Sequence, residues 1–239
     1  MGKRIYVEIP VSAPMDRLWH LTQDLSCHSR WDLRFSRIIP TNAAEPLTFR
    51  YEFRLPFHTI HGTGTSLGTR TGVQGHATSV LKFTTADPLS PIGPGAGYWR
   101  YVPDGKRTRF ITGYDYSPGW GRLGRWLDAP LIRPALGWAT AWSFDRLRLW
   151  AEEGLAPERT RNAWLLDAGA RAAAVAAAVT LCAVRPGPAA GLAAGSAVAA
   201  ACLAPARREV PRAARCLRRA RDGKTGVAPS SLASLKEPA

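Results

Sequence analysis

Alternation of apolar and polar residues predicts a β-sheet over much of the first 116 residues. The clearest strand is residues 47–55, where Phe49, Tyr51 and Phe53 share one face and charged residues occupy the other. Weaker alternation predicts further strands at 5–9, 35–40, 58–69, 78–85, 98–102 and 107–116. The sequence Pro-Asp-Gly between the last two strands is typical of a hairpin turn, so we expect neighbouring strands to pair antiparallel.

Helical periodicity replaces this alternation at two places. Residues 12–31 predict two short helices after the first strand. Residues 135–154 predict the longest helix of the first half, which a proline precedes and Gly154 ends. Its apolar stripe carries Trp138 and Trp142, and a helix with such a face needs a cover in water. We expect the sheet to provide that cover.

One strand, two short helices, about six antiparallel strands and a long helix thus follow one another along the chain. This order, the segment 13–19 (Ala-Pro-Met-Asp-Arg-Leu-Trp), the pair Trp31-Asp32 and the Trp-rich helix resemble the START-like superfamily, also called SRPBCC or polyketide cyclase/dehydrase-like. The resemblance covers roughly residues 3–154. It implies an α+β helix-grip fold, in which a curved antiparallel sheet wraps around the long C-terminal helix of the domain.

The resemblance also implies a deep cavity between the sheet and the long helix. Its lining is predicted to be aromatic, and the candidate ligand-binding residues are Phe49, Tyr51, Phe53, Tyr114, Tyr116, Trp138 and Trp142. Such a lining suits a hydrophobic molecule, such as a lipid, an isoprenoid or a polyketide. The alternative is that the same side chains fill the core and that the protein is a membrane interaction module.

An enzyme of this fold needs a general acid or base in the cavity. The weak candidate is Asp115, at the end of the last predicted strand between two tyrosines. The other interpretation of Asp115 is structural, as a carboxylate that binds a loop amide or an arginine such as Arg122 or Arg125. Because no nucleophile motif accompanies it, the sequence leaves open whether this is an aromatase/cyclase-like enzyme.

The five histidines predict no metal site. His58 and His61 lie three apart on a predicted strand and therefore face opposite sides of the sheet. His20 and His28 are expected at the surface of the first helices, and Asp32 is expected to cap a turn. We find no cofactor motif and expect neither a cofactor nor a metal.

Composition changes abruptly after the long helix. Between residues 163 and 206 nearly every residue is Ala, Gly, Val or Leu, apart from Asp167 and Arg171, which are spaced for an ion pair, and Arg185. We interpret residues 159–206 as a transmembrane helical hairpin that turns near Arg185. Three glycines spaced four apart form overlapping GxxxG patterns, which predict that the helices meet at Gly187, Gly191 and Gly195. The alternatives are a soluble Ala-rich helical pair and a basic amphipathic appendage.

Positive charge concentrates after this hairpin. The chain has a net charge of +14, and eight of its 32 Lys and Arg residues lie between residues 207 and 224. A basic run after an apolar segment is typical of a cytoplasmic membrane flank, so we expect residues 207–239 to form a disordered cytoplasmic tail. The START-like domain, residues 1–158, is expected on the same side of a bacterial cell membrane. No motif indicates nucleic-acid binding, and the oligomeric state stays open.

Overall fold

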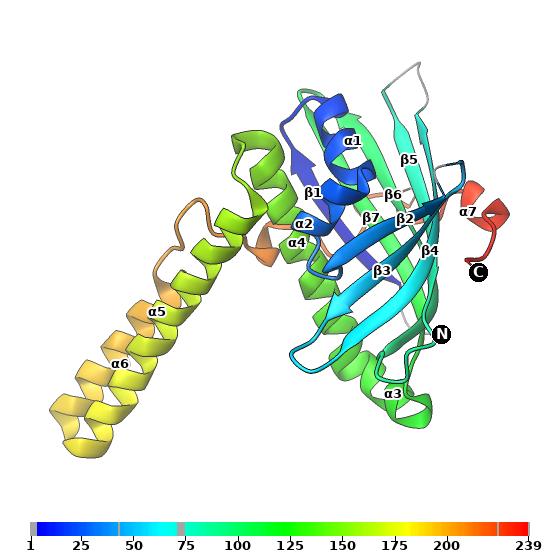
Figure 1. Ribbon diagram of the computed structural model, residues 1–239. Helices are drawn as coiled ribbons and strands as arrows, with labels where there is room; N and C mark the ends of the chain where they lie inside the picture. Colours follow the sequence, from blue (N-terminus) through cyan, green and yellow to red (C-terminus); the bar gives the residue numbers. More distant parts are fainter. Residues whose placement is uncertain (1–3, 43, 71–74, 224, 239) are drawn as a thin grey trace. The chain divides into compact units, whose positions relative to one another are not determined.

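The computed structural model describes residues 4–42, 44–70, 75–223 and 225–238. It divides into two compact units, visible in Figure 1 and described separately below. Unit 1 comprises residues 1–154 and 212–239, and unit 2 comprises residues 155–211. Residues 1–3 of the expected START-like domain and residues 224 and 239 of the expected tail lie outside the described residues.

Unit 1 contains a seven-stranded antiparallel sheet. Its strands are β1 (Ile5–Val11), β2 (Arg37–Asn42), β3 (Leu47–Arg54), β4 (Thr59–Arg70), β5 (Ala77–Thr84), β6 (Ile92–Asp104) and β7 (Arg107–Pro118). The spatial order is β1-β7-β6-β5-β4-β3-β2. Strands β2 to β7 therefore each pair with the strand next to them in the sequence, and β1 pairs with β7. The predicted hairpin is confirmed, because β6 and β7 pair from Asp104 and Arg107 onward.

Helices interrupt and follow the strands at the predicted places. Helices α1 (Met15–Gln23) and α2 (Leu25–Trp31) lie between β1 and β2, and α3 (Gly121–Leu127) follows β7. A π-helical turn, η1 (Asp128–Ile132), then leads directly into α4 (Arg133–Glu153). Helix α4 ends at Gly154, whose φ of 69° is left-handed and suits glycine.

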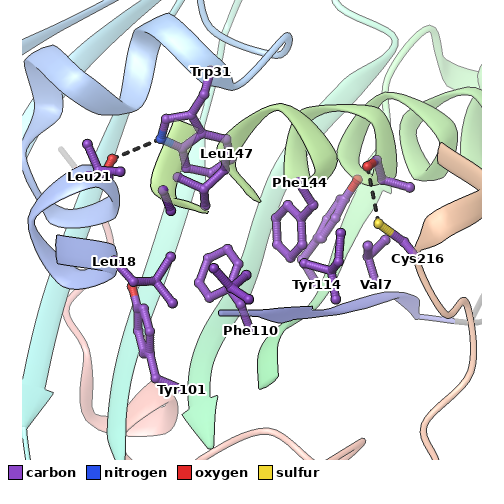
Figure 2. Close-up of a cluster of buried hydrophobic side chains, with 14 of the residues drawn as sticks. Val7, Leu18, Leu21, Trp31, Tyr101, Phe110, Tyr114, Phe144, Leu147 and Cys216 are labelled. Atoms are coloured by element: carbon purple, nitrogen blue, oxygen red, sulfur yellow. Dashed lines mark hydrogen bonds between the residues drawn. The ribbon is translucent and has the colours of Figure 1, made fainter. Parts of the chain in front are cut away.

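The core of unit 1 lies between the sheet and α4 (Figure 2). Phe144 and Leu147 of α4 pack in one cluster with Phe110 of β7, and the Phe110 and Phe144 ring centroids are 4.5 Å apart. Trp31 of α2 is fully buried in the same cluster, and its indole N–H donates to the Leu21 carbonyl at 2.9 Å. The sheet thus covers the long helix, as the helix-grip prediction requires.

The segment after residue 211 differs from the expected disordered tail. Residues 212–223 and 225–238, here called the C-terminal strap, belong to unit 1 and pack against its sheet and long helix. Leu217 exchanges both backbone hydrogen bonds with Glu8 of β1, at 3.0 and 2.8 Å. Figure 2 shows the Cys216 thiol against α4, where it donates to the Ala141 carbonyl at 3.2 Å. Cys216, which lies among the arginines of the basic run, belongs to the core cluster of unit 1, and so this part of the run packs on the fold.

The end of the strap lies over strands β5 and β6. Helix α7 (Ser231–Ser234) contacts both strands, and Figure 1 shows it beside the sheet. Leu235 is buried in a cluster with Val80 and Tyr98, and the Tyr98 hydroxyl donates to the Thr225 carbonyl at 2.7 Å. The strap therefore adds buried apolar surface to the sheet.

Unit 2 is a pair of helices, α5 (Pro157–Val184) and α6 (Pro188–Leu203). Within the described ranges, α5 is the helix long and apolar enough to cross a membrane. Its 28 residues extend about 42 Å, whereas the 16 residues of α6 extend about 24 Å. Arg171 of α5 pairs with Asp167 at 2.8 Å and donates to the Ala201 and Ala204 carbonyls at the end of α6.

The expected glycine contact between these helices is wrong. A Cβ atom placed on Gly187, Gly191 or Gly195 would meet no atom within 4 Å. The residues buried between the helices are instead Ala178 and Ala194. Alanine is small enough for close approach, and so the glycine stripe is left facing outward.

Candidate functional site

A cavity of about 240 Å³ lies in unit 1, between the sheet and α4. Its walls come from the first two helices, the loop after α2, the strands β3 to β7 and one stripe of α4. Most of the lining is apolar, and the aromatic side chains on the cavity side are Phe35, Phe49, Tyr51, Phe53, Phe83, Trp99 and Tyr114. The sheet and helix therefore enclose the kind of site that the resemblance implies.

The strands contribute most of the lining that was expected of them. Phe49, Tyr51 and Phe53 of β3 and Tyr114 of β7 line the cavity. Burial raises the pKa of Tyr51 to about 12, and its hydroxyl donates to the Thr84 carbonyl at 3.2 Å. The Tyr51 hydroxyl is therefore neutral at ordinary pH.

The long helix turns a different stripe to the cavity from the one predicted. Leu136 and Ala139 line it, whereas Trp138 and Trp142 do not. The two tryptophan rings stack on each other with centroids 6.1 Å apart, and Trp138 is 43% exposed. Several elements pack against α4, so more than one of its faces is covered. The position of a tryptophan on this helix therefore does not show which face lines the cavity.

Tyr116 and Asp115 also lie outside the cavity lining. The Tyr116 hydroxyl donates to Asp128 of η1 at 2.6 Å. Asp115 accepts a hydrogen bond from Arg133 at 2.9 Å and another from the Tyr116 amide. The structural interpretation of Asp115 is therefore the one observed, with Arg133 in place of the arginines that were expected. The aromatase/cyclase hypothesis loses its candidate residue.

A polar cluster of His28, Asp32 and Arg34 stands at the cavity wall. His28 and Arg34 line the cavity, and the Asp32 side chain behind them is 0% exposed. Asp32 accepts from His28 Nε2 at 3.1 Å and from Arg34 Nε and Nη2 at 2.9 and 2.6 Å. The carboxylate thus holds the histidine and the arginine side by side.

Both charges of the Asp32–Arg34 pair persist in the folded protein. Burial alone would raise the pKa of Asp32 and lower that of Arg34. The attraction between the two groups and their hydrogen bonds outweigh burial, so the pKa of Asp32 lies well below its ordinary value. The same pairing holds the pKa of Arg34 above its ordinary value.

Sequence reasoning missed this cluster. His28 was expected at the surface but is buried, with its ring stacked on Trp31 at 5.0 Å. Asp32 does cap a turn, because it also accepts the Arg34 backbone N–H at 3.0 Å. The available signal was the spacing of His28, Trp31 and Asp32, which places all three on one helical face.

A second group of metal-ligand residue types lies where α1 meets α2. Ligand atoms of His20, Asp24 and Cys27 lie within 4.8 Å of one another. Asp24 already caps α2 by accepting from the amides of Ser26 and Cys27. Burial and the Asp24 charge raise the pKa of the Cys27 thiol, which disfavours the thiolate that a metal needs. The expectation of no metal stays a prediction.

Comparison with known proteins places the chain beside a membrane protein. No protein-family model matches it. The "Uncharacterized membrane protein YndG" of Bacillus subtilis (strain 168) is 47% identical over 162 residues, which are 66% of this chain and 60% of the relative. The chain therefore spans less than two thirds of that relative's length.

Several solved structures are similar at low sequence identity. TTHA0849 from Thermus thermophilus is 14% identical with a TM-score of 0.47, covering 62% of this chain and 99% of that one. The Zhui aromatase/cyclase from Streptomyces sp. R1128 is 12% identical with a TM-score of 0.45, covering 63% and 98%. A STAR-related lipid transfer protein from Xanthomonas axonopodis is 17% identical with a TM-score of 0.46, covering 59% and 81%. By its strand order and its covered long helix, unit 1 has the START-like, helix-grip fold that the sequence resembles.

Proposed function

We propose that this protein binds a hydrophobic small molecule in the cavity of unit 1 and is tethered to a membrane by unit 2. The observation that carries the binding proposal is the mainly apolar cavity between the sheet and α4, which opens to solvent. Its volume of about 240 Å³ is below the roughly 300 Å³ at which drug-sized pockets begin. It exceeds the roughly 150 Å³ that accommodates benzene. The part of the ligand that the cavity would hold is therefore small, about two fused rings or a comparable apolar chain.

The membrane proposal rests on unit 2 and on the name of the relative. Helix α5 is long enough to span, and the Bacillus subtilis relative is called a membrane protein. The charge of Arg171 is compensated by Asp167 and by two carbonyls of α6, which is how charged residues are tolerated within a bilayer. Arg185 at the turn is exposed and favours water beyond the far interface. These features favour a hairpin that crosses fully, and because α6 extends only about 24 Å against the roughly 30 Å of a hydrocarbon core, the bilayer would thin around it.

The orientation proposal follows from the connection between the two units. The chain leaves unit 1 after residue 154 and returns to it at residue 212. Both ends of the hairpin must therefore lie on one side of the membrane. The basic residues after α6 favour the cytoplasmic side for that end.

Filling the cavity is expected to abolish binding. Ala139→Trp places a large ring at the cavity wall, whereas Ala135→Trp places the same ring at an exposed position of the same helix. We expect 2-naphthalenemethanol to bind the wild type and Ala135→Trp but not Ala139→Trp, as measured by titration calorimetry on the full chain in nanodiscs. Equal binding by both variants, or none by the wild type, contradicts the binding proposal.

Reporter fusions are expected to show one translocated site. Fusions after Gly154 and at the C-terminus should report the cytoplasm, and a fusion at Gly187, in the turn between α5 and α6, should report the outer side. The full chain should stay in the membrane pellet after carbonate extraction. A cytoplasmic signal at Gly187 would instead mean that the hairpin enters the membrane and returns without crossing.

A further inference from the structure

The described part of the cavity wall carries a positive charge without a negative one. This excess indicates which polar group the ligand has besides its apolar part. Among the described lining residues, Arg34 is the one permanently charged side chain, and no carboxylate is present. The carboxylate that balances Arg34 belongs to Asp32, which is fully buried and absent from the lining. A ligand in the cavity therefore meets a cation without meeting its counter-ion.

Arg34 retains hydrogen-bond donors for such a ligand. A guanidinium has five N–H donors, and the pair with Asp32 uses the one on Nε and one on Nη2. The Tyr114 hydroxyl is a further neighbour, and the guanidinium lies 5.1 Å from the centre of that ring. Two donors are left after these contacts, and the side chain is 19% exposed.

The guanidinium is also held in place before a ligand arrives. Two hydrogen bonds to one buried carboxylate fix its plane, and the rings of Tyr114 and Phe35 lie beside it at 5.1 and 5.8 Å. Little side-chain freedom is then lost on binding, which favours affinity. The planar fork matches the two oxygens of a carboxylate better than it matches a single hydroxyl.

We infer that the cavity takes an apolar molecule with one carboxylate, which Arg34 binds through its remaining N–H groups while the aromatic residues cover the apolar part. This inference rests on the proposed binding function and adds the chemical class of the ligand. It makes Arg34 a specificity-determining residue.

Two probes that share a ring system and differ in one group test the inference. The full chain in phosphatidylcholine nanodiscs is titrated at pH 7 with 2-naphthoic acid and with 2-naphthalenemethanol, and empty nanodiscs give the blank. We expect the acid to bind about tenfold more tightly than the alcohol, because the alcohol offers the guanidinium an uncharged oxygen in place of a charged carboxylate that can accept two hydrogen bonds.

The variants must remove the positive charge of Arg34 without leaving the buried Asp32 carboxylate unpaired. Asp32→Asn combined with Arg34→Gln removes both charges and keeps hydrogen-bonding groups at both positions. We expect this double variant to lose the preference for the acid, so that it binds the two probes with about equal affinity. Arg34→Lys, which keeps the charge that Asp32 needs, should fold even if the double variant does not, and should weaken the acid severalfold. Arg50→Gln removes an exposed arginine of β3 and should change neither affinity.

The possible results distinguish a failure of the carboxylate inference from a failure of the proposed binding function. If the wild type binds both probes equally, the carboxylate inference is wrong while the binding function stands. If the wild type binds neither probe, the binding function itself fails. If the double variant keeps its preference for the acid, or Arg34→Lys leaves the affinity for the acid unchanged, Arg34 is not the group that recognises it.

Discussion

Asp32→Ala is expected to lower the free energy of unfolding of unit 1 by about 3 kcal/mol. The substitution leaves Arg34 without its counter-ion and His28 without its hydrogen-bond partner at a site where water cannot replace them freely. The measurement is chemical unfolding of the full chain, followed by tryptophan fluorescence. Asp16→Ala is the matched control, because Asp16 forms an exposed pair with Arg70 and such pairs contribute little.

The same carboxylate predicts how stability depends on acidity. The pKa of Asp32 is lower in the folded protein than in the unfolded chain, where it is about 3.9. Its contribution is therefore complete above that value and is lost as the pH falls below it toward the folded-state pKa. The difference in stability between wild type and Asp32→Ala should shrink on acidification below about pH 4. A difference that stays constant down to about pH 2 would contradict this assignment.

Deleting residues 212–239 is expected to have a still larger effect and to prevent unit 1 from folding stably. The Asp145 side chain is 0% exposed and accepts from the Arg212 amide and the Arg215 guanidinium, each at 2.7 Å. The deletion also exposes the apolar surface that Cys216 and Leu235 cover. Lost charged hydrogen bonds and lost burial together amount to roughly 5 kcal/mol or more, which is comparable with the whole stability of many domains.

A shorter deletion provides the control for this prediction. Removing residues 237–239 keeps the buried part of the strap and breaks the ion pair between Lys82 and Glu237, whose carboxylate side chain is 76% exposed. That variant should melt within a few degrees of the wild type, whereas the long deletion should give aggregated protein without a cooperative transition. A cooperative transition at the wild-type temperature in the long deletion would show that the strap is dispensable.

The fold was readable from the sequence because its signals are local. Phe49, Tyr51 and Phe53 alternate with charged residues, and β3 does turn those rings inward to the cavity. The rotation of α4 was not readable in the same way. Its contacts with β1, η1 and the strap cover several faces, and no local pattern distinguishes the stripe of Leu136 and Ala139 from that of Trp138.

The missed parts of the structure depend on partners far away in the sequence. The helical pattern alone predicts Asp145 at a wet margin of the helix, but two residues about 70 positions later complete its hydrogen bonds. Likewise, the eight basic residues between 207 and 224 resemble a solvated tail until Asp145 is placed beside Arg212 and Arg215. The number of charged residues in the sequence shows how many ion-pair partners are needed, but it does not show where in the fold those partners lie.

The return of the chain to unit 1 fixes an order of events during synthesis. Tyr98 bonds to Thr225, 127 residues later, and everything between them, including α5 and α6, is made first. Because a chain emerges from its N-terminus, the hairpin is complete while unit 1 still lacks the C-terminal strap. Under the proposed membrane tether, insertion would precede the completion of unit 1, and a chain that stops before the strap would stay incompletely folded at the membrane surface.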